Sequence, residues 1–338
     1  MTGVKRADLV LSGGGVKGVG LVGAVVGLLD AGYVPQRISG TSAGSIVGAI
    51  VAASVVGEAQ TGAASGAQVK ELALQLDYRK FLDPGPVERV PLLGPSIALL
   101  RGSGIYRGDY VHEWVRSHLA DLGVTTFGDL ALDDDDLPPE QRYRLVVTVA
   151  DVTTGQLVRL PWDYRRVYGL DPDEQLVADA VRASMSIPFY FRPVSLTSTA
   201  GLTSTLVDGG LLSNFPIDSL DRTDGKAPRW PSFGITLLPN LPDGNDSTIP
   251  ALAALRLVGA PHLLEDVITT VLVGRDQAYL NQPWVNARAI RVDSTDVGFL
   301  DFDISENEVE AQYLKGYGAA TRFLADWDWT AYLRRYRR

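Results

Sequence analysis

Ser42 lies in the middle of residues 40–44, Gly-Thr-Ser-Ala-Gly, which have the Gly-x-Ser-x-Gly pattern of a nucleophile elbow. In such an elbow a strand ends, the chain turns sharply and a helix begins, so that one serine hydroxyl stands at the turn. Gly40 and Gly44 suit this turn because side chains there would clash with the packed strand and helix. Ser42 is therefore a candidate nucleophile, although the short motif alone also fits an ordinary glycine-rich turn.

Asp208 is the second candidate, because it ends the short apolar run 206–208 and is followed by Gly209 and Gly210. The two glycines leave the carboxyl group open to a partner side chain. A serine hydroxyl attacks an ester only when a base takes its proton, and none of the three histidines sits at a predicted strand end. A dyad of Ser42 and Asp208 therefore fits better than a triad. Taken by itself, Asp208 also fits a turn-forming Asp-Gly pair.

A glycine loop precedes the elbow, since residues 13–18 read Gly-Gly-Gly-Val-Lys-Gly. Consecutive glycines let neighbouring amide N–H groups point at one spot, which is what an oxyanion hole requires. We predict that Gly13, Gly14 and Gly15 form this hole with the amide of Ala43. The loop also matches the dinucleotide fingerprint Gly-x-Gly-x-x-Gly, so a nucleotide-binding protein stays open as an alternative. That fingerprint requires an acidic residue at the end of the next strand, where this chain has Ser-Gly-Thr.

The elements that must position these residues follow from hydrophobic periodicity. Apolar runs predict strands over residues 7–12, 37–39, 144–150, 157–160, 206–208, 233–238 and 287–292. Helical spacing predicts helices over residues 19–29, 45–53, 68–76, 110–119, 174–185, 252–280 and 306–327. Strands that alternate with helices predict an α/β fold with three layers, α/β/α, around a central, mostly parallel sheet.

Three segments are predicted to be irregular. Residues 57–66 are rich in Gly, Ala and Ser and predict a flexible connection. Residues 79–104 hold four prolines among apolar residues, which fits either a lid or acyl-chain wall, or a loop packed on the core. The end of the chain, 334–338, reads Arg-Arg-Tyr-Arg-Arg and predicts a basic tail, which either contacts anionic lipid or is simply solvated.

Composition narrows the class of protein. A chain of 338 residues, 46% of them hydrophobic, can form one large domain with a sizeable core. The absence of cysteine excludes disulfides and thiolate sites, and three histidines leave little material for a metal centre, so we predict no metal and no cofactor. A net charge of −9 argues against nucleic-acid binding. Without a signal-peptide core or a membrane-spanning stretch, the sequence predicts a cytoplasmic protein, with peripheral membrane contact left open.

The motifs taken together resemble the patatin-like phospholipases, a family of lipid acyl hydrolases, in their bacterial form. Residues 13–18, 40–44 and 208–210 carry the resemblance in this order. Ala-Ser-Met-Ser-Ile-Pro at 183–188 and Ala-Asp-Val-Thr-Thr-Gly at 150–155 also look like that family. The resemblance covers about residues 7–320 of a single domain predicted over 1–338, and three motifs in order are far more specific than any one.

The resemblance implies a patatin-like fold and a hydrolase that cleaves carboxylic esters of phospholipids or other lipids through an acyl-enzyme, without metal. It implies Ser42 and Asp208 as the dyad and Lys17 as the family's basic residue in the glycine loop. Supporting positions are Lys17, Gly18, Gly40, Gly44, Gly209 and Gly210. Acyl transfer to another alcohol and a gated lipid-binding effector module stay open as alternatives. Residues 79–104 and 250–280 are where such families vary, so the preferred lipid is left open.

Overall fold

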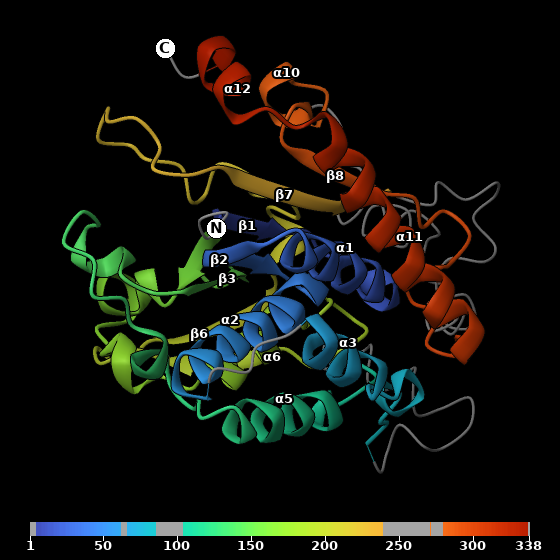
Figure 1. The fold of residues 1–338 in the computed structure, drawn as a ribbon. Helices are drawn as coiled ribbons and strands as arrows, with labels where there is room; N and C mark the ends of the chain where they lie inside the picture. Colours follow the sequence, from blue (N-terminus) through green and yellow to red (C-terminus); the bar gives the residue numbers. More distant parts are fainter. Residues whose placement is uncertain (1–4, 62–65, 86–103, 239–270, 272–279, 337–338) are drawn as a thin grey trace.

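A computed structural model describes residues 5–61, 66–85, 104–238, 271 and 280–336 (Figure 1). In these ranges eight strands form one sheet with the order β5-β6-β3-β2-β1-β7-β8, and β4 pairs with β3 beside this path. The strands are β1 (Lys5–Leu11), β2 (Tyr33–Thr41), β3 (Leu145–Asp151), β4 (Gln156–Leu160), β5 (Val194–Thr197), β6 (Thr203–Asp208), β7 (Ser232–Leu237) and β8 (Ala289–Val292).

The sheet is mixed, with a parallel centre. Strands β3, β2, β1, β7 and β8 run parallel, whereas β4, β5 and β6 are joined through antiparallel pairs. Parallel strands are covered on both faces, which explains why β3 and β7 are continuous runs of buried residues. The predicted central, mostly parallel sheet is therefore confirmed, as is the hairpin of β3 with β4.

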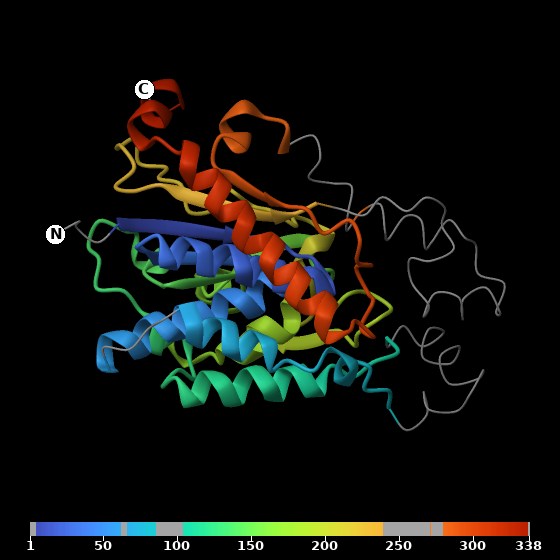
Figure 2. The ribbon, with the colours of Figure 1, turned by 45° about the vertical axis from the view of Figure 1, so that its right-hand side comes forward.

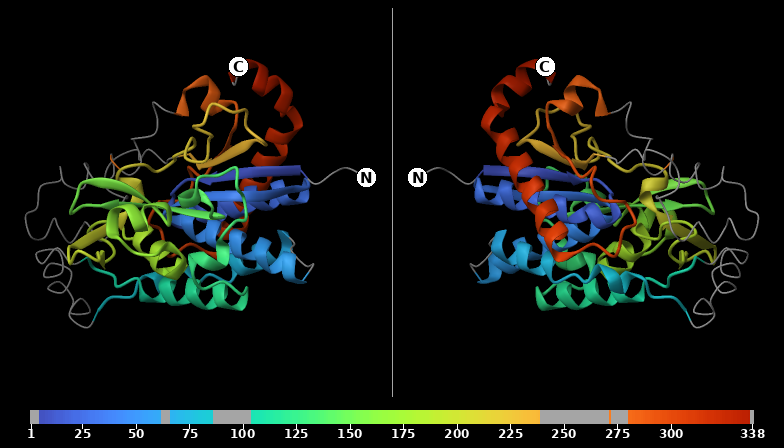
Figure 3. Two further views of the ribbon diagram at one scale, coloured as in Figure 1. Left: turned by 90° about the vertical axis from the view of Figure 1, so that its left-hand side faces the viewer. Right: turned by 90° about the vertical axis from the view of Figure 1, so that its right-hand side faces the viewer.

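Helices cover one face of the sheet as a broad layer. They are α1 (Gly18–Asp30), α2 (Ala43–Thr61), α3 (Gly66–Leu74), α5 (Asp109–Asp121), α6 (Val177–Ser184) and α11 (Glu306–Asp326), with α10 (Pro283–Asn286) and α12 (Trp329–Tyr336) elsewhere. Helix α11 runs along α1, and α2 and α3 lie next to α1 on its other side (Figure 2). Helix α5 lies at the opposite end of the molecule from α12 (Figure 3).

Alternation along β1 shows that both faces of the sheet are buried. Leu9 and Leu11 point into the large core beneath the helical layer. Val10, between them, belongs to a smaller core on the opposite face, together with Phe215 and with Val285 of α10. The sheet is thus the middle layer of the fold, as the sequence predicts.

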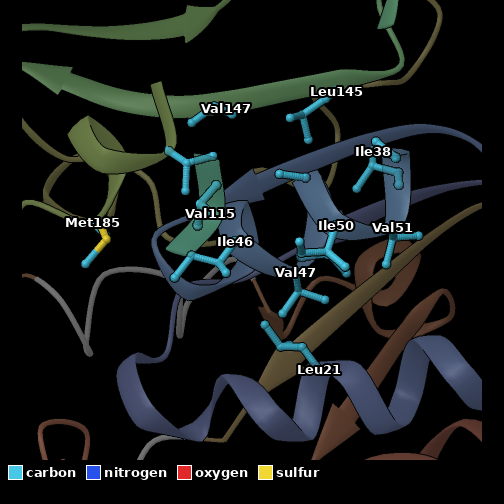
Figure 4. Packing of buried hydrophobic residues seen from close by; sticks show 14 of the residues in the cluster. Leu21, Ile38, Ile46, Val47, Ile50, Val51, Val115, Leu145, Val147 and Met185 are labelled. Carbon is cyan, nitrogen blue, oxygen red and sulfur yellow. The ribbon is translucent and has the colours of Figure 1, made fainter. Parts of the chain in front are cut away.

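Helix α2 starts at the elbow and is buried from Ala43 through residue 54. Figure 4 shows Val47 of α2 pointing toward Leu21 of α1, while Leu145 and Val147 of β3 lie across the core from them. A helix held on two sides fixes the direction in which its first residue leaves the strand. The position of Ser42, one residue before α2, is therefore set by the packing of the whole core.

Register explains how two distant motifs meet. Thr41, the last residue of β2, pairs with Thr148 of β3. On the other side of β3, Asp208 of β6 pairs with Val149. The elbow that follows Thr41 and the carboxyl group of Asp208 therefore flank the same point of β3, although 166 residues separate Ser42 from Asp208 in the sequence (208 minus 42).

Two predictions of irregular structure are wrong in part. Helix α2 continues to Thr61, because the Ala, Glu and Gln residues there are good helix formers. The first half of the predicted connection 57–66 is therefore helical, and residues 62–65 lie outside the described ranges. Arg334 and Arg335 lie in the last turn of α12, so the predicted basic tail begins as a helix. Trp329 and Tyr332 stack at a centroid distance of 5.8 Å within this helix, which the sequence prediction missed together with β5.

The boundaries of the other elements lie within a few residues of the predictions. Helix α6 begins at Val177, later than predicted, because Pro172–Glu174 forms a separate 3-10 turn before it. Most of the candidate lid 79–104 and of the predicted helix 252–280 lies outside the described residues.

Helices α1 and α11 pack with their backbones in contact. A Cβ atom placed on Gly23 of α1 would lie less than 3.0 Å from the carbonyl oxygen of Tyr313. One placed on Gly316 of α11 would lie equally close to the carbonyl oxygen of Gly20. A clash with backbone cannot be relieved by a change of rotamer, so this approach requires glycine at both positions.

We expect Gly316→Ala to lower the free energy of unfolding by about 1–3 kcal/mol through this overpacking. Gly318→Ala in the same helix is the control, because its Cβ would meet only the flexible Arg322 guanidinium at 3.2 Å. Because alanine has greater helix propensity than glycine, Gly318→Ala should be as stable as the parent or up to about 1 kcal/mol more stable. Chemical denaturation of both variants measures the difference. Equal stabilities would show that α1 and α11 do not pack as described.

Candidate active site

The elbow has the backbone geometry that its motif predicts. Ser42 follows β2 and precedes α2, with φ at +51°, in the left-handed region that non-glycine residues rarely adopt. Its side chain is 3% exposed. A Cβ atom on Gly40 would lie less than 3.0 Å from the carbonyl oxygen of Gly44, and one on Gly44 equally close to that of Leu11. Both flanking glycines are therefore needed for the turn to pack against the end of β1.

The carboxyl group of Asp208 is buried beside this turn. Asp208 is 1% exposed, and its Oδ1 accepts a hydrogen bond of 2.7 Å from the Gly210 amide. Burial raises its pKa to about 7, against the opposing effects of the nearby Ser42 hydroxyl and of the hydrogen bond from the Gly210 amide. Oδ2 meets no donor in strict hydrogen-bond geometry among the described residues. The Ser42 hydroxyl is close enough to lower the pKa of this carboxyl group, although no hydrogen bond between the two side chains is formed.

The turn after Asp208 lies against β3. A Cβ atom on Gly209 would come closer than 3.0 Å to the carbonyl oxygen of Thr148. Gly209 therefore lets the turn approach the strand, while Gly210 supplies the amide that holds the carboxyl group.

The glycine loop touches the elbow. A Cβ atom on Gly13 would lie 3.2 Å from Cβ of Ser42, and one on Gly18 would lie 2.9 Å from Cβ of Ala43. The loop and the elbow therefore pack directly against each other. In the sequence, Gly18 and Ala43 are 25 residues apart (43 minus 18). The loop glycines are needed here because larger residues would push the elbow away.

Three of the four predicted oxyanion-hole amides are available. The N–H groups of Gly14, Gly15 and Ala43 donate to no acceptor in the described part of the chain. Gly13 is a correction, because its N–H donates to the carbonyl oxygen of Asn214 at 3.1 Å. An amide already bonded to a carbonyl cannot hold a developing oxyanion, so Gly13 serves to shape the loop.

Lys17, within the glycine loop, is 3% exposed. Burial lowers its pKa to about 8, although the carboxylates of Asp296 and Asp293 act in the opposite direction. The segment that carries these aspartates also supplies the carbonyl oxygen of Phe299, which accepts the Val16 N–H at 3.2 Å. The Val16 hydrogen bond therefore connects the loop to the segment before α11, and the charge of Lys17 is attracted to the aspartates of that segment.

The same segment weighs against nucleotide binding at residues 13–18. A dinucleotide site needs free amides at the start of the helix to face a phosphate. Here the Gly13 amide is bonded to the carbonyl oxygen of Asn214 and the Val16 amide to that of Phe299, so fewer of the loop amides can face a phosphate. The Phe299 carbonyl lies so close to Gly15 that a Cβ atom there would clash with it, and a carbonyl oxygen repels phosphate.

An apolar pocket begins at Ser42 and runs along α2. Gly15 and Ala43 line its start, with Ile46, Val47 and Ile50 along the first two turns of α2. Its volume is about 60 Å³. The remaining lining residues are apolar or aromatic apart from glycine: Gly18, Val22, Val69, Ala73, Leu76, Tyr78, Phe81, Trp114, Met185, Ile187, Phe191 and Phe302.

Sequence reasoning missed several residues of this site. Ser184 bonds the amide of Ser42, Asn214 bonds that of Gly13, and Phe302 stacks on Phe81 at a centroid distance of 5.3 Å to close one side of the pocket. Ser184 lies within 183–188, a stretch that was recognised only as part of a resemblance. For Phe302 no local signal was available, since an isolated phenylalanine is more often a plain core residue.

The described residues show neither a membrane-spanning helix nor a metal site. No helix in the described ranges is both long and apolar enough to cross a membrane. The same part of the chain contains no group of three carboxylate or imidazole side chains arranged to hold a metal ion.

Comparison with known proteins identifies the family of the chain. The family model of the patatin-like phospholipases matches residues 9–221. Over 233 residues the chain is 37% identical to YqhO of Bacillus subtilis, covering 69% of this chain and 71% of that protein. It is 28% identical over 320 residues to an NTE family protein of Mycobacterium tuberculosis, covering 91% of this chain but 45% of that protein, so it spans less than half of that relative.

A solved structure shares the fold. VipD from Legionella pneumophila aligns with a TM-score of 0.52 and 18% sequence identity, covering 95% of this chain and 67% of that one. The family match contains the glycine loop, the elbow and Asp208. On these grounds the chain belongs to the patatin-like phospholipase family.

Proposed function

We propose that the protein hydrolyses carboxylic esters of lipids through a dyad of Ser42 and Asp208. The observation that carries the proposal is the Ser42 hydroxyl beside a buried carboxyl group, at the start of an apolar pocket. Membership of a family of phospholipases supports lipid ester hydrolysis as the class of reaction. The dyad itself is our assignment from the geometry.

In the proposed reaction Asp208 takes the proton of Ser42 while the serine oxygen attacks the ester carbonyl. The amides of Gly14, Gly15 and Ala43 hold the oxyanion, and loss of one such donor typically costs about 100- to 1,000-fold in rate. The proton passes from Asp208 to the leaving alcohol, which departs and leaves an acyl-enzyme. Water then attacks the acyl-enzyme, with Asp208 again as base, and releases the fatty acid.

The pocket accounts for the acyl half of the substrate. Its wall along α2 extends from Ala43 to Ile50, which is about 10 Å at the helical rise per residue. An apolar lining of that length suits contact with an acyl chain and helps to exclude water from the ester. The alcohol half of the substrate then lies outside the pocket, on the side of the glycine loop and Asn214. Lipid esters are held in membranes, so contact with a lipid surface belongs to the proposal.

We expect Ser42→Ala and Asp208→Asn each to lower the hydrolysis of a short-chain p-nitrophenyl ester at least ~1,000-fold, because the two residues act as a unit. Ser54→Ala is the matched control, since that buried hydroxyl bonds only the Ile50 carbonyl within α2. It should keep kcat within about twofold of the parent. Retention of activity by either dyad variant, with the fold intact by circular dichroism, would refute the assignment.

Burial of Asp208 also predicts a dependence of stability on pH. Its pKa is about 7 in the folded protein and about 3.9 when unfolded. The folded state therefore binds the extra proton, and stability falls as the pH rises from about 4 to 7. Asp208→Asn removes the buried charge, so it should melt a few degrees above the parent at pH 8 and close to it at pH 4. Scanning calorimetry at both values tests this. A lower melting temperature at pH 8 would contradict a destabilising carboxylate.

A further inference from the structure

Ser184, the last residue of α6, contacts the elbow from inside the core. Its hydroxyl accepts a hydrogen bond of 2.8 Å from the Ser42 N–H. The same hydroxyl donates a hydrogen bond of 2.8 Å to the carbonyl oxygen of Thr148 in β3. Ser184 is fully buried, so both bonds form away from water. One side chain thus connects the backbone of the candidate nucleophile to the central strand of the site.

The Ser42 amide needs this partner. With φ at +51°, Ser42 has left the ladder of β2 and has not yet entered α2, so neither element satisfies its N–H group. A buried amide without a partner is unfavourable. A bond to a fixed hydroxyl also holds the peptide plane before Ser42, and that plane orients the Cα–Cβ bond that carries the hydroxyl group.

The next residues of the same segment hold Asp208. The carbonyl oxygen of Ser186 accepts the N–H of Asp208 at 2.9 Å. The Ser186 hydroxyl is bonded in turn by the buried guanidinium of Arg182 at 2.6 Å, which also binds the carbonyl oxygen of Arg192 at 2.9 Å. Two positions on one short segment therefore contact the two residues of the proposed dyad. Ser42 directly follows β2 and Asp208 ends β6, and these two strands lie on either side of β3.

We propose that Ser184 is a positioning residue, and that residues 184–186 form a strut that fixes the separation of Ser42 from Asp208. Ser184 reaches neither the substrate nor the transferred proton; it acts by orienting Ser42. The predicted effect of Ser184 on the rate of hydrolysis rests on the proposed function, whereas the hydrogen bond between Ser184 and the Ser42 amide does not. A positioning role predicts a fall in kcat at nearly constant KM, because the acyl pocket is unchanged.

The test compares Ser184→Ala with Ser54→Ala, which removes another buried hydroxyl away from the site. Kinetics with a p-nitrophenyl ester and hydrogen exchange of the Ser42 amide are measured on both variants. We expect Ser184→Ala to lower kcat about 10- to 100-fold, with KM within about twofold, as small displacements of reacting groups do. Exchange at Ser42 should become at least about tenfold faster, since the amide loses its partner. Ser54→Ala should change neither quantity.

Ser184→Cys keeps the size of the side chain with a weaker hydrogen-bonding group, so its kcat should fall between those of the parent and Ser184→Ala. It also carries the test if Ser184→Ala does not fold. Unchanged kcat together with unchanged exchange at Ser42 would overturn the proposal. If the parent protein hydrolyses no ester, the proposed function fails and the effect on rate fails with it. Exchange at Ser42 still decides whether the strut exists.

Discussion

The site depends on one backbone constraint, a serine held in the left-handed region between β2 and α2. A non-glycine residue stays in that conformation only when its surroundings over-determine it. Here Gly44 permits contact with the end of β1, Ser184 binds the Ser42 amide, and the buried start of α2 fixes the direction of the chain. Strain at Ser42 is thus offset by packing in the whole helical layer, which explains why so much of the core converges on this turn.

A second constraint is the burial of Asp208. Removing the carboxyl group from water raises its pKa to about 7, which destabilises the fold near neutral pH but makes the carboxylate a stronger base. The Gly210 amide limits this cost by binding Oδ1 and leaves Oδ2 for Ser42. Stability and reactivity therefore make opposite demands on one side chain, a pattern common at catalytic sites.

Much of this arrangement could be predicted from local sequence. Ser42, Asp208 and the glycine loop lie at sharp turns, whose glycines are visible as short motifs, and periodicity located most strands and helices. The roles of Gly13 and Ser184 could not be predicted, because hydrogen bonds from segments more than 100 residues away decide them. Helix α12 is amphipathic, but it is only eight residues long and its last turn holds the arginines that suggest a basic tail, so the sequence prediction missed it. Short motifs therefore predicted the candidate catalytic residues, whereas hydrogen bonds between distant segments could not be predicted.

The central claim is that Asp208 activates Ser42. It is tested most directly by the rate at which a fluorophosphonate labels the protein between pH 5 and 9, with the modified residue identified by peptide mapping. The account predicts a single adduct on Ser42, formed at a rate that rises with pH and levels off above about pH 7, as Asp208 ionises. Asp208→Asn should abolish most of that rate. Labelling of Ser42 that is equally fast in Asp208→Asn would contradict the claim.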